Sequence, residues 1–134
     1  MPRDVYYLDS LKKLVREKSL LDHVFFQGAR PFTEVSSVYN DHDIFISMST
    51  TGSIDKSVLE AMSSGLTVIC ANEAFQTLLP AKYFLEKRSP EFLAERIKML
   101  ADEDRPNTVL RNLVVENHSL EKTVKKIIDV YTKF

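Results

Sequence analysis

The stretch IFISMSTTGSIDKSVLEAMSSGLTVIC, residues 44–70, decides the fold of this chain. It contains two runs, residues 44–48 and 66–70, that are apolar along most of their length, which is typical of buried strands. Between them, residues 56–64 are predicted to form a helix that closes at Gly65. Strands without polar alternation, joined by a helix, predict a parallel β-α-β unit.

The sequence on both sides of this unit continues the alternation of helices and strands. On the N-terminal side we expect an amphipathic helix at residues 5–18, a strand at residues 24–26, and a short helix after Pro31 that Thr33 can cap. On the C-terminal side a short strand is predicted near residues 83–85. Three further helices are expected to begin at the capping residues Ser89, Asn107 and Ser119. The whole pattern predicts a doubly wound parallel α/β sheet in one domain, residues 1–134.

Composition and charge narrow the class of protein. The chain has 134 residues, of which 44% are hydrophobic and 28% charged, and this excludes a disordered tail, collagen and a disulfide scaffold. Eighteen basic side chains against nineteen acidic ones give a net charge of −1, with no basic run that would indicate nucleic-acid binding. The single cysteine, Cys70, lies in a predicted buried strand. Because there is neither a signal core nor an apolar run of about 20 residues, we expect a cytoplasmic protein without a transmembrane segment.

The predicted topology selects three loops as the ligand site. In such sheets ligands bind beyond the carboxyl ends of the strands, here residues 27–32, 49–56 and 71–75. The middle loop leads directly into a helix N-terminus, where backbone amides and the helix dipole favour a phosphate group. The alternative is a plain Ser/Thr-rich turn that Asp55 caps. With only three glycines, neither the G-x-G-x-x-G fingerprint nor a Walker A loop is present.

Several motifs in this order carry a family resemblance. The run SVLEAMSSGLTVI, residues 57–69, resembles the E-A-M-x-x-G-x-P-V-I signature of the family 4, or group 1, glycosyltransferases. The run LDHVFFQG, residues 21–28, is similar to that family's L-x-D-x-V-x-F-x-G. The resemblance implies a Rossmann-like, partial C-terminal domain of the GT-B fold. It further implies that the chain is the donor-binding half of a retaining enzyme of carbohydrate biosynthesis. Such an enzyme would transfer a hexosyl group from a nucleotide-sugar to an unknown acceptor. It would use neither a cofactor nor a bound metal.

The resemblance also assigns roles to individual residues. Glu60 matches the second acid of the family's E-x7-E motif and would bind the ribose hydroxyls, although a helix glutamate can also be merely solvated. The loop before it would hold the distal phosphate and the sugar, while Lys56 either faces the diphosphate or is solvated. By the same resemblance, the base pocket would be lined by Gln27, Gly28, Ala29 and Arg30. The donor-site residues in the loop and the first helical turn would be Gly52, Ser53, Ile54, Asp55, Lys56 and Ser57.

Two departures from the family pattern affect what this chain can do. The first acid of E-x7-E would fall at position 52, where the chain has Gly52. Asp55 is the nearest carboxylate in sequence and could replace that acid only if the loop folds differently. In addition, Met1 stands where the family has already completed a strand-helix-strand unit, so we expect that unit and the N-terminal acceptor domain to be missing. A shortened sheet follows, in which the strands at residues 24 and 44 pair directly or a second copy forms a homodimer along the open edge.

Two other classes of protein stay open from the sequence. One is a signalling module in the manner of a receiver domain, for which Asp41 and Asp43 would form an acidic pocket. The other is a non-catalytic protein that retains the glycosyltransferase fold, as Gly52 permits. The scattered histidines favour neither a metal site nor a nucleophile. In either case, and also as the donor half of an enzyme, the chain on its own is expected to lack transferase activity.

Overall fold

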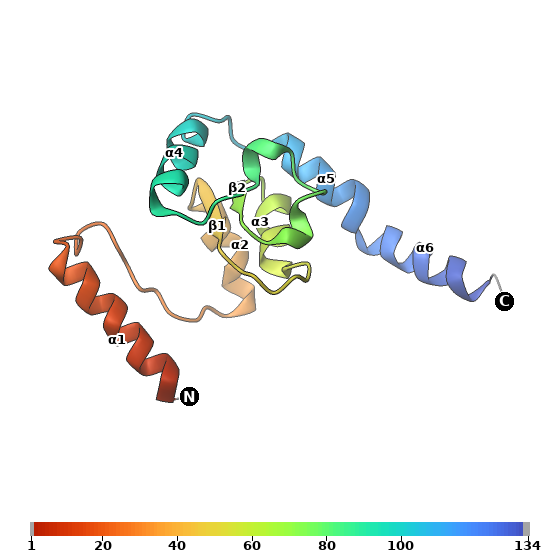
Figure 1. The fold of residues 1–134 in the computed structure, drawn as a ribbon. Helices are drawn as coiled ribbons and strands as arrows, with labels where there is room; N and C mark the ends of the chain where they lie inside the picture. Colours follow the sequence, from red (N-terminus) through yellow and green to blue (C-terminus); the bar gives the residue numbers. More distant parts are fainter. Residues whose placement is uncertain (1, 133–134) are drawn as a thin grey trace. The chain divides into compact units, whose positions relative to one another are not determined.

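The computed structural model describes residues 2–132 and has a mixed α/β architecture. Figure 1 shows its elements along the chain. The α-helices are α1 (Pro2–Glu17), α2 (Phe32–Asn40), α3 (Lys56–Ser63), α4 (Pro90–Leu100), α5 (Thr108–His118) and α6 (Leu120–Tyr131). The strands are β1 (Ile44–Ser47) and β2 (Thr67–Cys70), and two short 3-10 helices follow, η1 (Glu73–Phe75) and η2 (Ala81–Tyr83). The chain divides into two units, Met1–Phe32 and Thr33–Phe134, which we describe separately.

The first unit contains α1 and an irregular segment. The helix is followed by a left-handed residue, Ser19 with φ of +56°, whose amide donates to the carbonyl of Arg16. Residues 24–31 that follow adopt neither helix nor strand, and the side chain of Phe25 is 73% exposed. The prediction of a strand at residues 24–26 is therefore wrong. Three apolar residues can form a stable strand only when a neighbouring strand pairs with their backbone groups.

The β-α-β unit that the sequence predicts is confirmed. β1 and β2 pair in parallel, with Ile44 opposite Thr67 and Ser47 opposite Cys70, and the two strands lie side by side in Figure 1. α3 connects them and packs against both, with Val58, Ala61 and Met62 buried. All four residues of β2 are buried, as fits a strand covered on both faces. The thiol of Cys70 lies in this core, and its burial raises its pKa.

Gly65 ends α3 in the way the sequence predicts. Its φ is +77°, the left-handed conformation that glycine adopts without a steric penalty. The amide of Gly65 donates to the carbonyl of Met62, and the amide of Leu66 donates to the carbonyl of Ala61. This pair of bonds satisfies two carbonyls of the last turn and directs the chain into β2.

The sheet is shortened, in agreement with the sequence, but it is shorter than expected. Among residues 2–132 the sheet consists of β1 and β2. Residues 24–26 form no strand, so one of the two alternatives for the open edge, direct pairing of two strands, lacks its second strand. The strand predicted near residues 83–85 is reduced to one parallel bridge between Phe84 and Cys70. At this bridge the amide of Leu85 donates to the carbonyl of Cys70, at 2.8 Å.

The later helices begin where the sequence places them. The side chains of Ser89, Asn107 and Ser119 accept hydrogen bonds from amides in the first turns of α4, α5 and α6. Thr33, which was expected to cap α2, instead lies inside it, because the helix already begins at Phe32. α4 packs against β2 and α5 against α3. Within residues 2–132, no helix is both long enough and apolar enough to cross a bilayer.

Candidate functional site

Two of the three predicted ligand loops meet at the carboxyl ends of β1 and β2, where Asn72 joins them. The side chain of Asn72 is fully buried. Its Nδ2 donates to Asp55 Oδ2 at 2.9 Å and to the carbonyl of Ser53 at 2.8 Å, while its Oδ1 accepts from the amide of Ala74 at 3.0 Å. One side chain from the loop after β2 thus fixes the loop after β1.

Asp55 occupies the residue before α3, but its carboxylate does not cap the helix. It makes no side-chain bond to the first-turn amides. Instead, Oδ2 accepts from Asn72, and Oδ1 accepts from the hydroxyl of Thr51 at 3.3 Å. The hydrogen bond from Asn72, with smaller contributions from Ser49 and Thr51, lowers the pKa of Asp55 against the opposing effect of desolvation. The alternative in which the Asp55 side chain caps α3 is therefore wrong, and the amino end of α3 carries no side-chain cap from it.

Glu60 lies one turn into α3, and its carboxylate has two neighbours. Its Oε2 accepts from the hydroxyl of Tyr39 at 3.3 Å, and its Oε1 lies 3.5 Å from Nζ of Lys56. The side chain of Glu60 is 30% exposed and that of Lys56 is 80% exposed. A ligand approaching the amino end of α3 can therefore still reach the Glu60 carboxylate. Its role in ribose binding stays a prediction.

Tyr39 is a site residue that the sequence reasoning missed. It comes from α2, and its ring packs edge-on against Phe45 of β1 with the ring centroids 5.9 Å apart. Desolvation, followed by the negative charge and the hydrogen bond of Glu60, raises the pKa of the Tyr39 hydroxyl, so it stays protonated and donates. The only signal in the sequence is its place on the inner face of the predicted helix, which does not indicate a polar contact.

Glu73 and Arg88 are two more charged residues at this edge that the sequence reasoning did not select. The guanidinium of Arg88 donates to the carbonyl of Ala71 at 2.7 Å and lies 3.6 Å from Oε2 of Glu73. Both side chains border an open hollow of about 490 Å³ beside the carboxyl end of β2. Neither residue belongs to a motif: Glu73 follows β2, and Arg88 follows the bridge between Phe84 and Cys70.

The residues predicted to line the base pocket lie in the first unit. Gln27, Gly28 and Arg30 follow one another in the irregular segment, where Gly28 has φ of +71°. Their assignment to a nucleotide base stays a prediction. The structure groups the loop residues Gly52, Ser53, Ile54, Asp55, Lys56 and Ser57 with Glu60 in the second unit.

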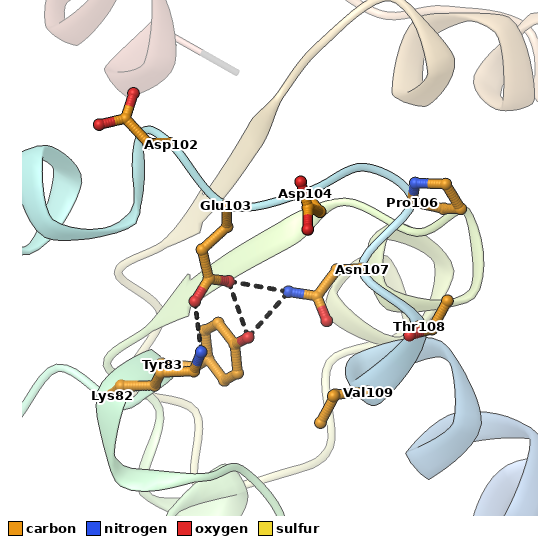
Figure 2. Close-up of a pocket in the computed structure, with 9 residues that line it drawn as sticks. All are labelled: Lys82, Tyr83, Asp102, Glu103, Asp104, Pro106, Asn107, Thr108 and Val109. Carbon is orange, nitrogen blue, oxygen red and sulfur yellow. Dashed lines mark hydrogen bonds and ion pairs between the residues drawn. The ribbon is translucent and has the colours of Figure 1, made fainter.

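A second pocket, of about 370 Å³, lies toward the amino end of β2 (Figure 2). In it Glu103, Tyr83 and Asn107 point toward one another. The side-chain amide of Asn107 donates to the Tyr83 hydroxyl at 2.9 Å and to Glu103 Oε2 at 3.0 Å. The Tyr83 hydroxyl in turn donates to the same Glu103 oxygen at 2.8 Å. Lys82 pairs with the other oxygen of Glu103. Burial of Glu103 opposes ionisation, but the bonds from Lys82 and Tyr83 prevail and lower its pKa. These groups satisfy one another and join α5 to the sheet.

Comparison with known proteins gives one match. The family described as glycosyl transferases, group 1, matches residues 4–103, which is roughly three quarters of the 134-residue chain. No curated protein and no solved structure matches this chain. Among residues 2–132, no group of three or more His, Cys, Asp or Glu side chains is arranged to hold a metal ion.

Proposed function

The chain belongs to the group 1 glycosyltransferases, and on this basis we propose that it is the donor-binding part of a retaining enzyme. The enzyme transfers a hexosyl group from a nucleoside diphosphate sugar to an acceptor whose identity the sequence does not specify. The observation that carries the proposal is the amino end of α3, which combines an uncapped helix start with a carboxylate one turn further on.

The chemistry of this helix end suits a nucleoside diphosphate. The amides of the first turn and the positive end of the helix dipole favour a phosphate group. Glu60 lies four residues beyond Lys56, about 6 Å along the helix axis. We propose that its carboxylate reaches the ribose, which is joined to this distal phosphate through the proximal one. A carboxylate accepts two hydrogen bonds from a vicinal diol, each worth about 1.5–3 kcal/mol when one partner is charged.

The same groups would assist the chemical step. When the bond between the sugar and the diphosphate breaks, negative charge builds on the leaving phosphate. The α3 amides stabilise that charge without any reorganisation of the site. Lys56, whose exposed side chain pairs with Glu60, would turn toward the same phosphate. In this proposal the nucleotide-sugar is a substrate and the reaction uses no cofactor.

The partners in this proposal follow from the two-domain plan of the GT-B fold. The acceptor is held by a second, facing domain, so the chain on its own binds the donor and does not transfer sugar. A second copy of the chain can pair along the outer edge of β1, because residues 44–47 carry no charge that would oppose strand pairing.

Titration of the whole chain with UDP-glucose and GDP-mannose, followed by amide chemical shifts, tests the proposal. We expect shifts at residues 52–60 and at least a tenfold loss of affinity in Glu60→Gln, since one charge-assisted hydrogen bond is worth about that factor. Glu95→Gln is the matched control, because Glu95 is exposed on α4. If neither nucleotide-sugar shifts any of these amides, the donor-binding assignment is wrong.

Gly52 favours one alternative, a protein that keeps the glycosyltransferase fold and binds a nucleotide-sugar without turning it over. Transfer by the complete enzyme that contains this chain would exclude it.

A receiver-like module has no such support. Asp43 lies at the amino end of β1 and pairs with Arg105 at 3.0 Å, at the edge of the sheet opposite the ligand loops.

A further inference from the structure

We propose that Glu73 supplies the carboxylate that position 52 lacks, and that the hollow beside it binds the sugar of the donor. This inference rests on the proposed function and assigns a new residue to it. Glu73 comes from the turn after β2, whereas Gly52 comes from the loop after β1, so only the fold brings them together.

The geometry places one oxygen of Glu73 next to the open position at Gly52. A Cβ atom built on Gly52 would lie 3.6 Å from Oε1 of Glu73, which is an ordinary van der Waals contact. The other oxygen, Oε2, faces Arg88 at 3.6 Å, and Arg88 is anchored on the carbonyl of Ala71 at 2.7 Å. The carboxylate therefore occupies the region that a side chain at position 52 would enter.

Asp55, the acid nearest to Gly52 in the loop, is unsuited to this task. Its two carboxylate oxygens already accept hydrogen bonds from Thr51 and Asn72. A ligand hydroxyl would have to displace bonds that fix the loop. Glu73, in contrast, is 59% exposed, and its ion pair with Arg88 is open to solvent, where such pairs add little stability. Its carboxylate can therefore turn toward a ligand at low cost.

The lining of the hollow favours a neutral, hydroxyl-bearing ligand over a second phosphate. Glu73 and Glu86 contribute two carboxylates, against one guanidinium from Arg88, so an added anion would be repelled. Carboxylates accept from vicinal hydroxyls, and the amide of Gln76 can both donate and accept. The volume, about 490 Å³, lies within the range of about 300–1,000 Å³ for small-molecule sites. The phosphates would bind at α3 and the sugar ring would lie beside Glu73.

Calorimetric titration of the whole chain with matched ligand pairs tests this assignment. UDP is compared with UDP-glucose, and GDP with GDP-mannose, so that the contribution of the sugar is isolated in each pair. In Glu73→Gln we expect the sugar-bearing ligands to bind about tenfold more weakly, while the affinities for UDP and GDP stay within a factor of two. Glu95→Gln, an exposed change of the same type on α4, leaves all four affinities unchanged.

Relocating the carboxylate is the sharper test. Starting from Glu73→Ala, which loses the sugar preference, the added change Gly52→Asp returns an acid to the same region. Asp is among the residues that best tolerate the left-handed conformation that φ of +66° imposes at this position. We expect at least a partial return of the preference for UDP-glucose over UDP. A thermal melt of each variant verifies that the fold is retained.

Three results would overturn the inference. The first is a Glu73→Gln variant that keeps the full preference for the sugar-bearing ligands. The second is an equal loss for the sugar-bearing ligand and the bare diphosphate, which would make Glu73 part of the phosphate site. The third is a wild-type chain that binds UDP and UDP-glucose equally well, which leaves donor binding standing. If the wild type binds none of the four ligands, the proposed function fails too, so the two failures are distinguishable.

Discussion

Asn72 organises the candidate site, although no motif includes it. It is fully buried. Its side-chain amide donates to the carbonyl of Ser53 and to Asp55 in the loop after β1, and it accepts from the backbone amide of Ala74 in the segment after β2. A buried amide that satisfies all of these contacts holds a loop in one conformation, because each alternative conformation leaves a polar group without a partner. The positions of Ser53 and Asp55, and through them the start of α3, depend on this side chain.

Replacing Asn72 by alanine is therefore expected to destabilise the fold. We expect Asn72→Ala to lower the free energy of unfolding by about 1–3 kcal/mol, the cost of leaving buried polar groups unpaired. Urea unfolding of the whole chain measures this. Asn117→Ala is the matched control, because Asn117 makes one exposed hydrogen bond to the carbonyl of Leu113 and should change stability by less than about 0.5 kcal/mol. Equal effects of the two changes would contradict the role of Asn72.

The same substitution has a consequence at acid pH. The folded-state pKa of Asp55 lies below its ordinary value, chiefly because Asn72 donates to it. A carboxyl with a lowered pKa stabilises the fold at pH values above its ordinary, unfolded-state pKa. That contribution is lost as the pH falls through the pKa of the folded state. In Asn72→Ala the pKa of Asp55 rises toward its ordinary value and this part of the acid dependence weakens. Side-chain carboxyl shifts during an NMR titration measure it.

At this scale the sequence predicts which near neighbours lie together better than it predicts contacts between residues that are distant along the chain. Glu60 and the loop before it lie close together because they are near neighbours along the chain. The contacts of Tyr39, Glu73 and Arg88 span 15 to 21 positions, and no local pattern indicates them. The position of Asp55 before α3 makes it a possible helix cap, yet its carboxylate turns to Asn72, which lies 17 residues away.

At the scale of elements, the turn at Gly65 is where the β-α-β unit is most sensitive to change. A Cβ atom on Gly65 would lie 2.6 Å from Cβ of Pro106, which is closer than real Cβ contacts come, and 3.2 Å from its Cα, which is a tight contact. The amide of Asn107 also donates to the carbonyl of Gly65 at 2.8 Å, so the segment before α5 packs directly on this turn. The glycine is required both by its backbone conformation and by its neighbour.

We expect Gly65→Ala to destabilise the chain more than the same change at Gly52. At Gly65 the substitution combines a left-handed alanine, about 1–2 kcal/mol, with a steric overlap, about 1–3 kcal/mol. At Gly52, with φ of +66° and a nearest contact of 3.6 Å, only the first cost applies. Paired urea unfolding curves give the difference. Equal losses would mean that the segment at Pro106 moves aside without cost.

The elements that the sequence predicts correctly are those whose signals are complete within a short segment. α3, α4, α5 and α6 each combine an apolar pattern with a start or stop residue, and β1 and β2 have a helix between them. The predicted strands at residues 24–26 and 83–85 depend on a neighbouring strand for their hydrogen bonds. The first is absent and the second is a single bridge, because three apolar residues in sequence do not supply that neighbour.

For the whole molecule, burial is concentrated in the second unit. The core cluster consists of residues from α3, β2 and the segments after them, among them Met62, Ile69, Phe75 and Tyr83. In the first unit, among the residues whose side chains are described, Val15 alone is buried. Regions with few buried apolar side chains open at low free energy, whereas core strands open only when the fold as a whole unfolds. The two units should therefore differ in local stability.

Amide hydrogen exchange tests this difference in local stability. It also tests the strand at residues 24–26, which the sequence predicts and the structure lacks. We expect the amides of Thr67 and Ala71, which donate to carbonyls at the two ends of β1, to exchange at rates set by global unfolding. Residues 25–30 should exchange close to the rate of an unfolded chain, because they belong to no helix or strand and Phe25 is exposed. Both sets of amides are measured in the same spectrum, so β2 calibrates the scale. Protection of residues 25–30 comparable to that of β2 would mean that this segment pairs as a strand in solution, as its apolar sequence predicts.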